Sequence, residues 1–250
     1  MTADEMCVVV GATGAMGAVI TGRLAARGYR VLAVARSADE LEKLAADNDR
    51  IVGCPADIGR DEAVVQISER LEGPVRLAVF AAGLPVKGSA DSIAPSALAT
   101  AANVKVAGPV RLLHAVRDHF IEGSRFVSIA GSLGLEPGPL DAGPGTANAA
   151  LLNLMHQISE LYGPRGVTVH TIAPGPIDTP RLRKFVDTES AETGRPRSEI
   201  WDRYHNKTSL GRLPTLDEIG WLVEILLEPA AAVLHGSVLN ADGGTRHGIS

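Results

Sequence analysis

The sequence predicts an α/β fold, a three-layer α-β-α sandwich built on a doubly wound parallel sheet. One observation is that short runs rich in Val, Ile and Ala alternate with segments whose apolar residues recur at helical spacing. Strands that alternate with helices in this way form parallel sheets covered on both faces. The other is that the first strand-like run ends in a glycine-rich turn, which predicts a ligand site at the carboxyl ends of the strands.

Length and composition narrow the class of protein. A chain of 250 residues with 45% hydrophobic residues is long enough for one buried core, and we expect a single domain over residues 1–250. A net charge of −5 without a dense Lys/Arg block disfavours nucleic acid as a partner. No apolar run is long enough to cross a membrane, and because acidic residues follow Met1 we expect no signal peptide. Cys7 and Cys54 are interpreted as core residues of a cytoplasmic protein.

The first strand, residues 7–10, leads through three glycines spaced three apart into a helix expected at residues 14–27. The first glycine permits the turn, the second lets a phosphate approach the backbone, and the third lets the helix lie against the strand. Unpaired N–H groups at the helix start also favour an anion. An ordinary helix capped by a glycine-rich turn is the alternative. The expected cofactor contacts are Gly11, Thr13, Gly14, Ala15, Met16 and Gly17.

The second strand, residues 29–35, ends at Arg36 and Ser37. A site selective for NAD usually has an acidic side chain here for the ribose 2′-hydroxyl, whereas a guanidinium suits the 2′-phosphate of NADP. Because the first carboxylate is Asp39, we predict NADP (NADPH) in preference to NAD, with a solvated loop arginine as the alternative. Ser37 is also expected to cap a helix that ends at Ala46.

Two more strands are expected, at residues 50–54 and 75–80. Asp57, with Ile58, follows the first of them at a place where an adenine amino group can be bound. Asp57 could equally cap a helix over residues 61–71. The small residues after the second strand permit close approach of a cofactor, with a plain left-handed turn as the alternative. They are Ala81, Ala82 and Gly83.

The second half of the chain continues the alternation. Helices are expected at residues 95–120, 146–161 and 215–227, and strands at residues 124–130, 167–172 and 236–240. A Gly/Pro-rich loop is expected at residues 131–145, and the polar residues 181–210 are interpreted as a mobile lid insertion over a pocket. Aromatic residues of the lid suggest a sizeable apolar or aromatic substrate, although packing within the lid explains them equally well.

Taken together, these residues resemble the short-chain dehydrogenase/reductase family over nearly the whole chain. The features are the turn 11–17, Asp57, 81–83, Asn103, the block 174–179 and the closing residues 242–244. The resemblance implies a Rossmann fold, a nicotinamide cofactor, oxidoreductase activity on a small molecule, and a homo-oligomer packed through two long central helices. It also implies a cofactor contact by the block with Pro174 and Gly175. There Ile177 and Thr179 flank the nicotinamide, and Thr179 reaches its carboxamide or a phosphate.

The glycine turn departs slightly from the family's common single-domain form, because Ala15 stands where a glycine is usual. A larger departure concerns the chemistry. Family members resemble one another in a Ser that orients the carbonyl, a Tyr that exchanges the proton, and a Lys that lowers the pKa of that Tyr and holds the ribose. Matching Ala149 and the helix after it puts the lysine position at Asn148 and the tyrosine position at Pro144. The serine position falls on Gly131.

A small shift of this match does not restore the usual residues. The chain has no tyrosine between Tyr29 and Tyr162 and no lysine between Lys105 and Lys184. Pro144 has neither a side-chain proton nor a backbone N–H to offer. Asn148 is neutral, so it can bind a ribose hydroxyl but cannot lower the pKa of a neighbour as an ammonium does.

We therefore name Asn103, Ser132 and Asn148 as the candidate catalytic residues. Ser132 lies one step after the expected serine position, although a loop serine that caps a turn is favoured for it. By resemblance Asn103 would hold a water beside the missing lysine, and here it could be only a structural polar group. Weaker candidates, each with a packed or solvated alternative, are Asp141, His156, His170, Tyr204 and His205.

Three classes of function fit the sequence. The first is an enzyme, an NADP(H)-dependent reductase of a carbonyl compound, whose proton comes from water, from the lid or from the substrate. The second is a sensor or partner protein that binds NADP(H) without turnover. The third is a non-redox cyclase, dehydratase or aldolase-type enzyme that relies on a residue such as Asp141 or His170. We favour the first, with no metal.

Overall fold

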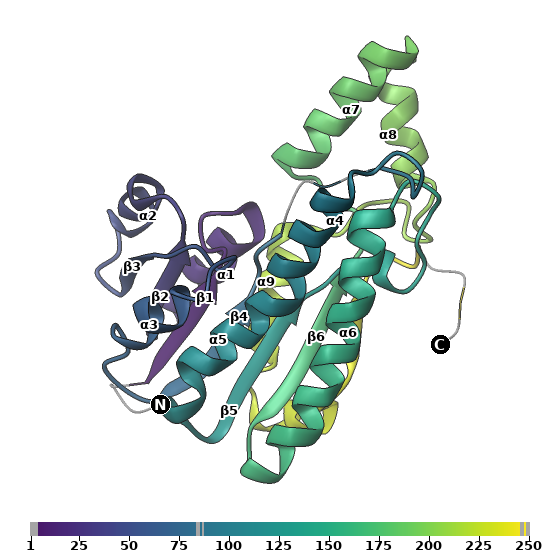
Figure 1. Ribbon diagram of the computed structural model, residues 1–250. Helices are drawn as coiled ribbons and strands as arrows, with labels where there is room; N and C mark the ends of the chain where they lie inside the picture. Colours follow the sequence, from purple (N-terminus) through teal and green to yellow (C-terminus); the bar gives the residue numbers. More distant parts are fainter. Residues whose placement is uncertain (1–4, 84–85, 87, 246–247, 249–250) are drawn as a thin grey trace.

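The computed structural model contains one sheet of seven parallel strands between two layers of helices (Figure 1). It describes residues 5–83, 86, 88–245 and 248. The strands are β1 (Met6–Val10), β2 (Arg30–Ala35), β3 (Ile51–Pro55), β4 (Val75–Phe80), β5 (Phe120–Ile129), β6 (Thr168–Pro174) and β7 (Val238–Ala241). Their order in the sheet is β3-β2-β1-β4-β5-β6-β7, so the direction of winding reverses between β1 and β4. The predicted three-layer, doubly wound fold is confirmed.

Helices cover both faces of this sheet. They are α1 (Ala15–Ala26), α2 (Ala38–Ala45), α3 (Ala63–Ser68), α4 (Pro95–Ala102), α5 (Gly108–Val116), α6 (Ala142–Tyr162), α7 (Pro180–Thr193), α8 (Arg197–His205) and α9 (Leu216–Ile225). Buried residues of α1, α2 and α9 belong to one core cluster, and buried residues of α3, α5 and α6 belong to the other. Among the described residues, no helix is long and apolar enough to cross a bilayer.

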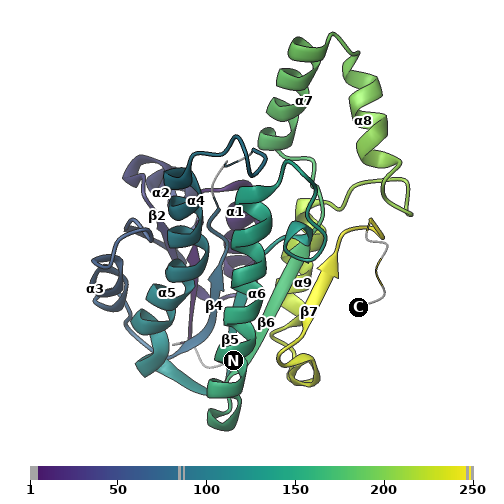
Figure 2. The ribbon, with the colours of Figure 1, turned by 45° about the vertical axis from the view of Figure 1, so that its right-hand side comes forward.

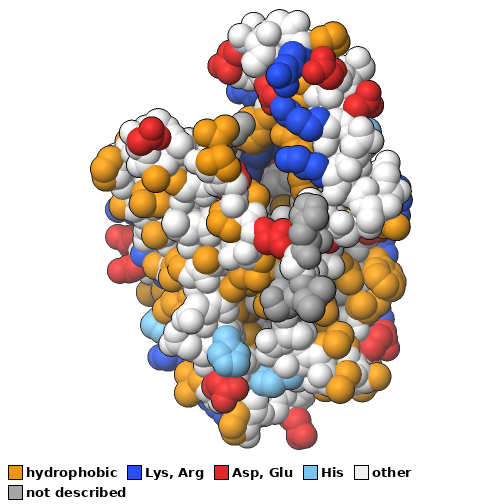
Figure 3. Space-filling view, turned by 90° about the vertical axis from the view of Figure 1, so that its right-hand side faces the viewer, with side chains coloured by type: hydrophobic (Ala, Val, Ile, Leu, Met, Phe, Trp, Pro, Cys, Tyr) orange, Lys and Arg blue, Asp and Glu red, His pale blue; other side chains and the backbone are white. Residues whose placement is uncertain are grey.

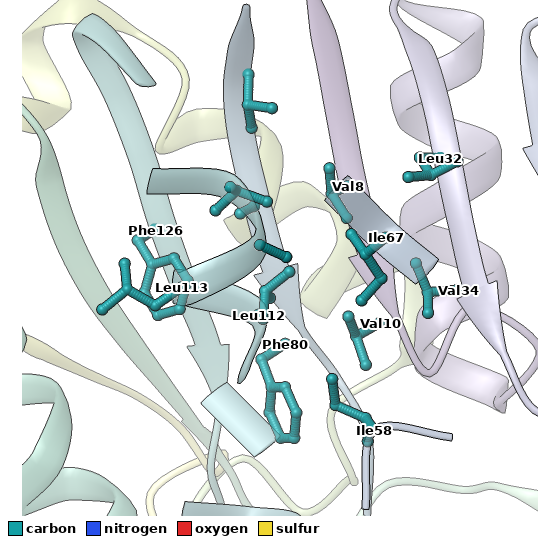
Figure 4. Packing of buried hydrophobic residues seen from close by; sticks show 14 of the residues in the cluster. Val8, Val10, Leu32, Val34, Ile58, Ile67, Phe80, Leu112, Leu113 and Phe126 are labelled. Carbon is teal, nitrogen blue, oxygen red and sulfur yellow. The ribbon is translucent and has the colours of Figure 1, made fainter. Parts of the chain in front are cut away.

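Alternate residues of each strand enter opposite cores, because successive side chains of a strand point to opposite faces. On β1, Val8 and Val10 pack toward α3 and α5, whereas Cys7 and Val9 pack toward α1 and α9. Figure 4 shows the first of these cores, with Phe80 of β4 beneath the helix that carries Leu112. Both cysteines, Cys7 and Cys54, are buried and free, and burial raises the pKa of each thiol.

The segment expected as a helix at residues 95–120 is helical as far as His119, but it is not uniformly α-helical, and Phe120 begins β5. A π-helical segment, Asn103–Ala107, separates α4 from α5, and the N–H of Gly108 donates to the carbonyl of Asn103. Pro109 lacks the N–H that would bond the carbonyl of Lys105, so a regular α-helical pattern cannot continue through this point. The helix therefore contains one wider turn directly beside the sheet.

Two other segments differ from the expectation. The loop expected at residues 131–145 is shorter, because α6 begins at Ala142 and not at Thr146. Pro144 lies in the first turn of α6, where a missing N–H has no intrahelical partner to lose. Residues 181–210, interpreted as a mobile lid, form the helices α7 and α8, which project together from the body of the molecule (Figure 2).

The close approach of α5 to β4 gives a prediction about stability. A Cβ on Gly108 would lie 2.8 Å from Cε2 of the Phe80 ring, whereas a Cβ on Gly22 of α1 meets nothing within 4 Å. We expect Gly108→Ala to lower the free energy of unfolding by about 1–3 kcal/mol through overpacking. Gly22→Ala is expected to raise it by roughly 0.5–1 kcal/mol, because alanine favours a helix. Urea unfolding of both variants measures this, and equal effects at the two positions would contradict the packing argument.

Candidate cofactor and active site

A cavity of about 590 Å³ opens at the carboxyl ends of the strands, around the point where the winding direction reverses. Its volume is in the range of small-molecule and cofactor sites. Residues from the ends of β1, β2, β4 and β5 line it, together with residues of α6 and the start of α7. Figure 3 shows a hollow in the surface next to the projecting helices, with Lys and Arg side chains gathered beside it.

The glycine turn after β1 forms the floor of the cavity and is built from backbone contacts. Gly11 has a φ of +82°, and a Cβ there would lie 2.8 Å from the backbone nitrogen of Ala82. A Cβ on Gly17 would lie 2.1 Å from the carbonyl oxygen of Gly11, so only glycine lets α1 rest on this turn. Gly14 is the N-cap of α1 and makes no side-chain cap. The first N–H groups of α1 therefore have no side-chain acceptor and can receive an anion.

The end of β2 presents Arg36 to the cavity, where it also borders a second hollow of about 440 Å³. Arg36 is exposed and forms no ion pair with any residue that the structure describes. Ser37 caps α2 as expected, since its Oγ accepts the N–H of Glu40 at 3.3 Å, but it does not line the cavity.

Asp57 and Ile58 also line this end of the cavity. The Asp57 carboxylate accepts the N–H of Gly59 at 3.0 Å, and the N-cap of α3 is Glu62. The alternative that Asp57 caps the next helix is therefore wrong.

At the other end, Ala81, Ala82, Gly83 and Thr179 line the cavity. Gly83 has no left-handed backbone conformation, so the plain left-handed turn considered for it is wrong. Thr179 also caps α7, because its Oγ1 accepts the N–H of Leu182 at 3.2 Å.

Three expected contacts from the block after β6 do not reach the cavity wall. Pro174, Gly175 and Ile177 are absent from its lining. A Cβ on Gly175 would lie 3.0 Å from Cα of Asp242, so this glycine packs against the closing segment. Among these residues, Ile177 is buried in the core that contains α1 and α9.

The positions matched to the family's tyrosine and lysine both face the cavity. Pro144 and Asn148 lie one helical turn apart on α6. Asn148 is only 6% exposed, and its Oδ1 has no hydrogen-bond partner in the described part of the chain. A buried acceptor without a partner is unfavourable, so a bound hydroxyl donor would stabilise this site.

Asn103 and Ser132 are not brought to the cavity. Nδ2 of Asn103 donates to the carbonyl of Gly59 at 2.8 Å, and its Oδ1 accepts from Arg111 at 3.0 Å. These contacts are those of a structural polar group on the side of the helix that faces α3. Ser132 is buried in a short turn after β5 and does not line the cavity.

The weaker candidates also lie elsewhere. Asp141 accepts the N–H of Gly138 at 2.9 Å, and His156 is exposed on α6. His170 is buried in the sheet and hydrogen-bonds the carbonyl of Leu234 at 3.0 Å and Thr168 Oγ1 at 2.9 Å. Tyr204 and His205 pack against Trp201 within α8. In the described ranges, no group of His, Cys, Asp and Glu could hold a metal ion.

Sequence reasoning missed two cations in the wall of the cavity, Lys105 and Arg181. Nζ of Lys105 donates to the carbonyl of Ile129, the last residue of β5, at 2.8 Å. Burial, and then the charge of Arg181, lower the pKa of Lys105 to about 8. One signal in the sequence could have indicated Lys105. It lies two residues after Asn103, and side chains two apart on a helix point in nearly opposite directions, so only one of the two can face the cavity.

The sheet order, the glycine turn at the reversal point and the open helix N-terminus define a dinucleotide-binding α/β protein. Residues 11–246 match the family model described as enoyl-(acyl carrier protein) reductase. The chain is 26% identical to the short-chain reductase protein NovJ of Streptomyces niveus, over 96% of this chain and 94% of that protein. It is also 26% identical to acetoacetyl-CoA reductase of Shinella zoogloeoides, over 96% and 98% of the two chains.

A solved structure agrees with these relatives. The short-chain dehydrogenase of Burkholderia cenocepacia J2315, in complex with NADP, is 25% identical, with a TM-score of 0.85 over 97% of this chain and 98% of that chain. The chain belongs to the short-chain dehydrogenase/reductase family and is an oxidoreductase of that family.

The buried histidine of the sheet predicts a pH dependence of stability. Burial lowers the pKa of His170 from its usual 6.5 to about 4. Below pH 6.5 this imidazole binds a proton in the unfolded chain but stays neutral in the folded chain. The contribution of neutral His170 to the free energy of unfolding is therefore full above pH 6.5 and is lost as the pH falls toward 4. Between pH 7 and pH 5 the free energy of unfolding should fall by ~2 kcal/mol more in the wild type than in His170→Asn. Parallel urea titrations measure this, and identical pH slopes would contradict it.

Proposed function

We propose that this protein binds NADP(H) and reduces a small carbonyl compound. The observation that carries the proposal is the guanidinium of Arg36 at the end of β2, exposed beside the cavity and without an ion-pair partner among the described residues. A 2′-phosphate is the group that a guanidinium binds best at this place. The NADP bound to the Burkholderia relative supports the same cofactor class.

The residues present fit a dinucleotide along the whole cavity. The open N–H groups of α1 would hold the pyrophosphate, and Asp57 would bind the adenine. Asn148 would accept a ribose hydroxyl at its unpartnered Oδ1, which relieves the cost of a buried acceptor. Thr179 would lie against the nicotinamide carboxamide or a phosphate.

When bound, a dihydronicotinamide supplies the hydride for carbonyl reduction. The chain's own part is to hold the carbonyl compound in the part of the cavity that Gly83 and Thr179 line. Helices α7 and α8 lie where a lid was expected, and we propose that they cover this end of the site. The cytoplasmic location and the homodimer or tetramer stay predictions of the sequence.

One observation favours a second candidate, a sensor or partner protein that binds NADP(H) without turnover. The described residues of the cavity wall include no tyrosine, serine or histidine, so the usual proton donors of this chemistry are missing. The third class, a non-redox enzyme that relies on Asp141 or His170, has no such support, because neither residue lines the cavity.

The cofactor preference gives the test of the proposal. We expect Arg36→Ala to weaken NADPH binding about tenfold or more, since hydrogen bonds to charged groups contribute roughly 1.5–3 kcal/mol. NADH affinity should be nearly unchanged, because NADH lacks the 2′-phosphate. Fluorescence titration with both nucleotides measures the difference, and Arg117→Ala, remote from the cavity, is the control. Equal losses for both nucleotides, or no loss for NADPH, would sink the assignment of Arg36.

A further inference from the structure

A lysine from a helix other than α6 reaches the active-site end of the cavity. Nζ of Lys105 lies 2.8 Å from the carbonyl oxygen of Ile129, where β5 ends, and both residues line the cavity with Pro144 and Asn148. The cavity therefore holds an ammonium group, although the lysine position on α6 is occupied by a neutral amide.

Lys105 lies in the π-helical segment, on the side of the helix opposite Asn103. Two successive residues along a helix turn the chain by roughly 200°, so Asn103 and Lys105 point to nearly opposite sides. Asn103 faces Gly59 and Arg111, and Lys105 faces the end of β5. The wider turn, closed by the bond from the N–H of Gly108 to the carbonyl of Asn103, lies beside the cavity.

The charges around Lys105 leave it without a carboxylate partner among the described residues. A Cβ placed on Gly83 would lie 3.8 Å from Cε of Lys105 and 3.9 Å from Nη1 of Arg181, so the two cations flank this glycine. Arg181, from α7, is the charged group that acts on the ammonium. The carboxylates that line the cavity, Glu40 and Asp57, come from α2 and from the segment after β3.

No other group in the described wall combines a proton with the ability to release it near neutral pH. The pKa of Lys105, lowered to about 8, leaves its ammonium mostly protonated at pH 7 and a better acid than an ordinary lysine. A guanidinium such as that of Arg181 keeps its proton in proteins. Asn148 is neutral and Pro144 has no side-chain proton.

We propose that Lys105 is the proton donor of this site, in place of the family's tyrosine. The inference rests on the proposed carbonyl reduction. The carbonyl carbon accepts the hydride that the dinucleotide supplies, so the carbonyl is reduced and the dinucleotide is oxidised. As the C–H bond forms, the carbonyl oxygen takes a proton from Nζ: an N–H bond breaks and an O–H bond forms. The product is an alcohol, and the neutral amine regains a proton from solvent.

The test compares Lys105→Met and Lys105→Gln with Lys43→Met, a change in an exposed lysine of α2 outside the cavity wall. The probes are NADPH and butane-2,3-dione. We expect both Lys105 variants to lose about 100-fold or more in kcat, the usual contribution of a general acid, while the Kd for NADPH changes less than about threefold. Lys43→Met should match the wild type. Retained kcat in the Lys105 variants would overturn the donor role alone.

The pH profile separates proton donation from a structural contact with Ile129. The wild-type kcat should be full below about pH 8 and fall above it, because the ammonium must be protonated to donate. Arg181→Leu removes a like charge and should move this fall to higher pH. A profile that is flat across pH 8, or one unaffected by Arg181→Leu, would overturn the proposal.

A measurement without turnover completes the test. Acylation of Lys105 by acetic anhydride, followed by mass spectrometry of the peptide, reports the fraction of neutral amine at each pH. We expect a midpoint near pH 8 in the wild type and a higher midpoint in Arg181→Leu. If the wild-type protein binds NADPH and oxidises none with butane-2,3-dione or the other carbonyl probes of a broad panel, reductase function fails. The donor role fails with it, and the second candidate stands.

Discussion

The contact of Gly17 with the carbonyl of Gly11, and of Gly11 with the backbone of Ala82, is the constraint on which the rest of the site depends. Three backbone segments meet there without any side chain between them. Because α1 rests directly on the turn, its open N-terminus points into the cavity. Because the turn also packs against the end of β4, the cavity lies where the two halves of the sheet adjoin. A single methyl group at either glycine would separate these parts.

The sequence predicts the fold well because its strands carry their own signal. Val8 and Val10 enter one core and Val9 the other, so a continuous apolar run correctly indicated a strand covered on both faces. The beginning of α6 was misplaced, because glycine and proline usually indicate a loop and Pro144 is tolerated in the first turn of a helix. The π-helical turn depends on the chain around Pro109 and on packing against the sheet, which periodicity does not reveal.

The residues of the site also fall into a group that the sequence predicts and a group that it does not. The cofactor contacts expected at the glycine turn, Arg36 and Asp57 come from short stretches of the sequence, and all of these residues line the cavity. The end of the site at Lys105 is assembled from distant segments, α6, α7, β5 and the π-helical turn. A motif specifies where a family places its lysine, and it does not indicate that a side chain from a neighbouring helix reaches the same cavity. The motif therefore indicated Asn103, which faces away from the cavity, and did not indicate Lys105, which lies in the cavity wall.

The π-helical turn has a consequence for how this chain can vary. Such a turn holds one residue more than the α-helical turn it replaces, so deleting one residue within Asn103–Ala107 would change the directions in which the side chains of this turn point. Asn103 and Lys105 would then lose their present partners together. A substitution along this helix changes one side chain. A change in its length would alter both the hydrogen bonds of Asn103 on the side of α3 and the charge that Lys105 brings to the cavity. The number of residues in this turn therefore affects both sides of the helix at once.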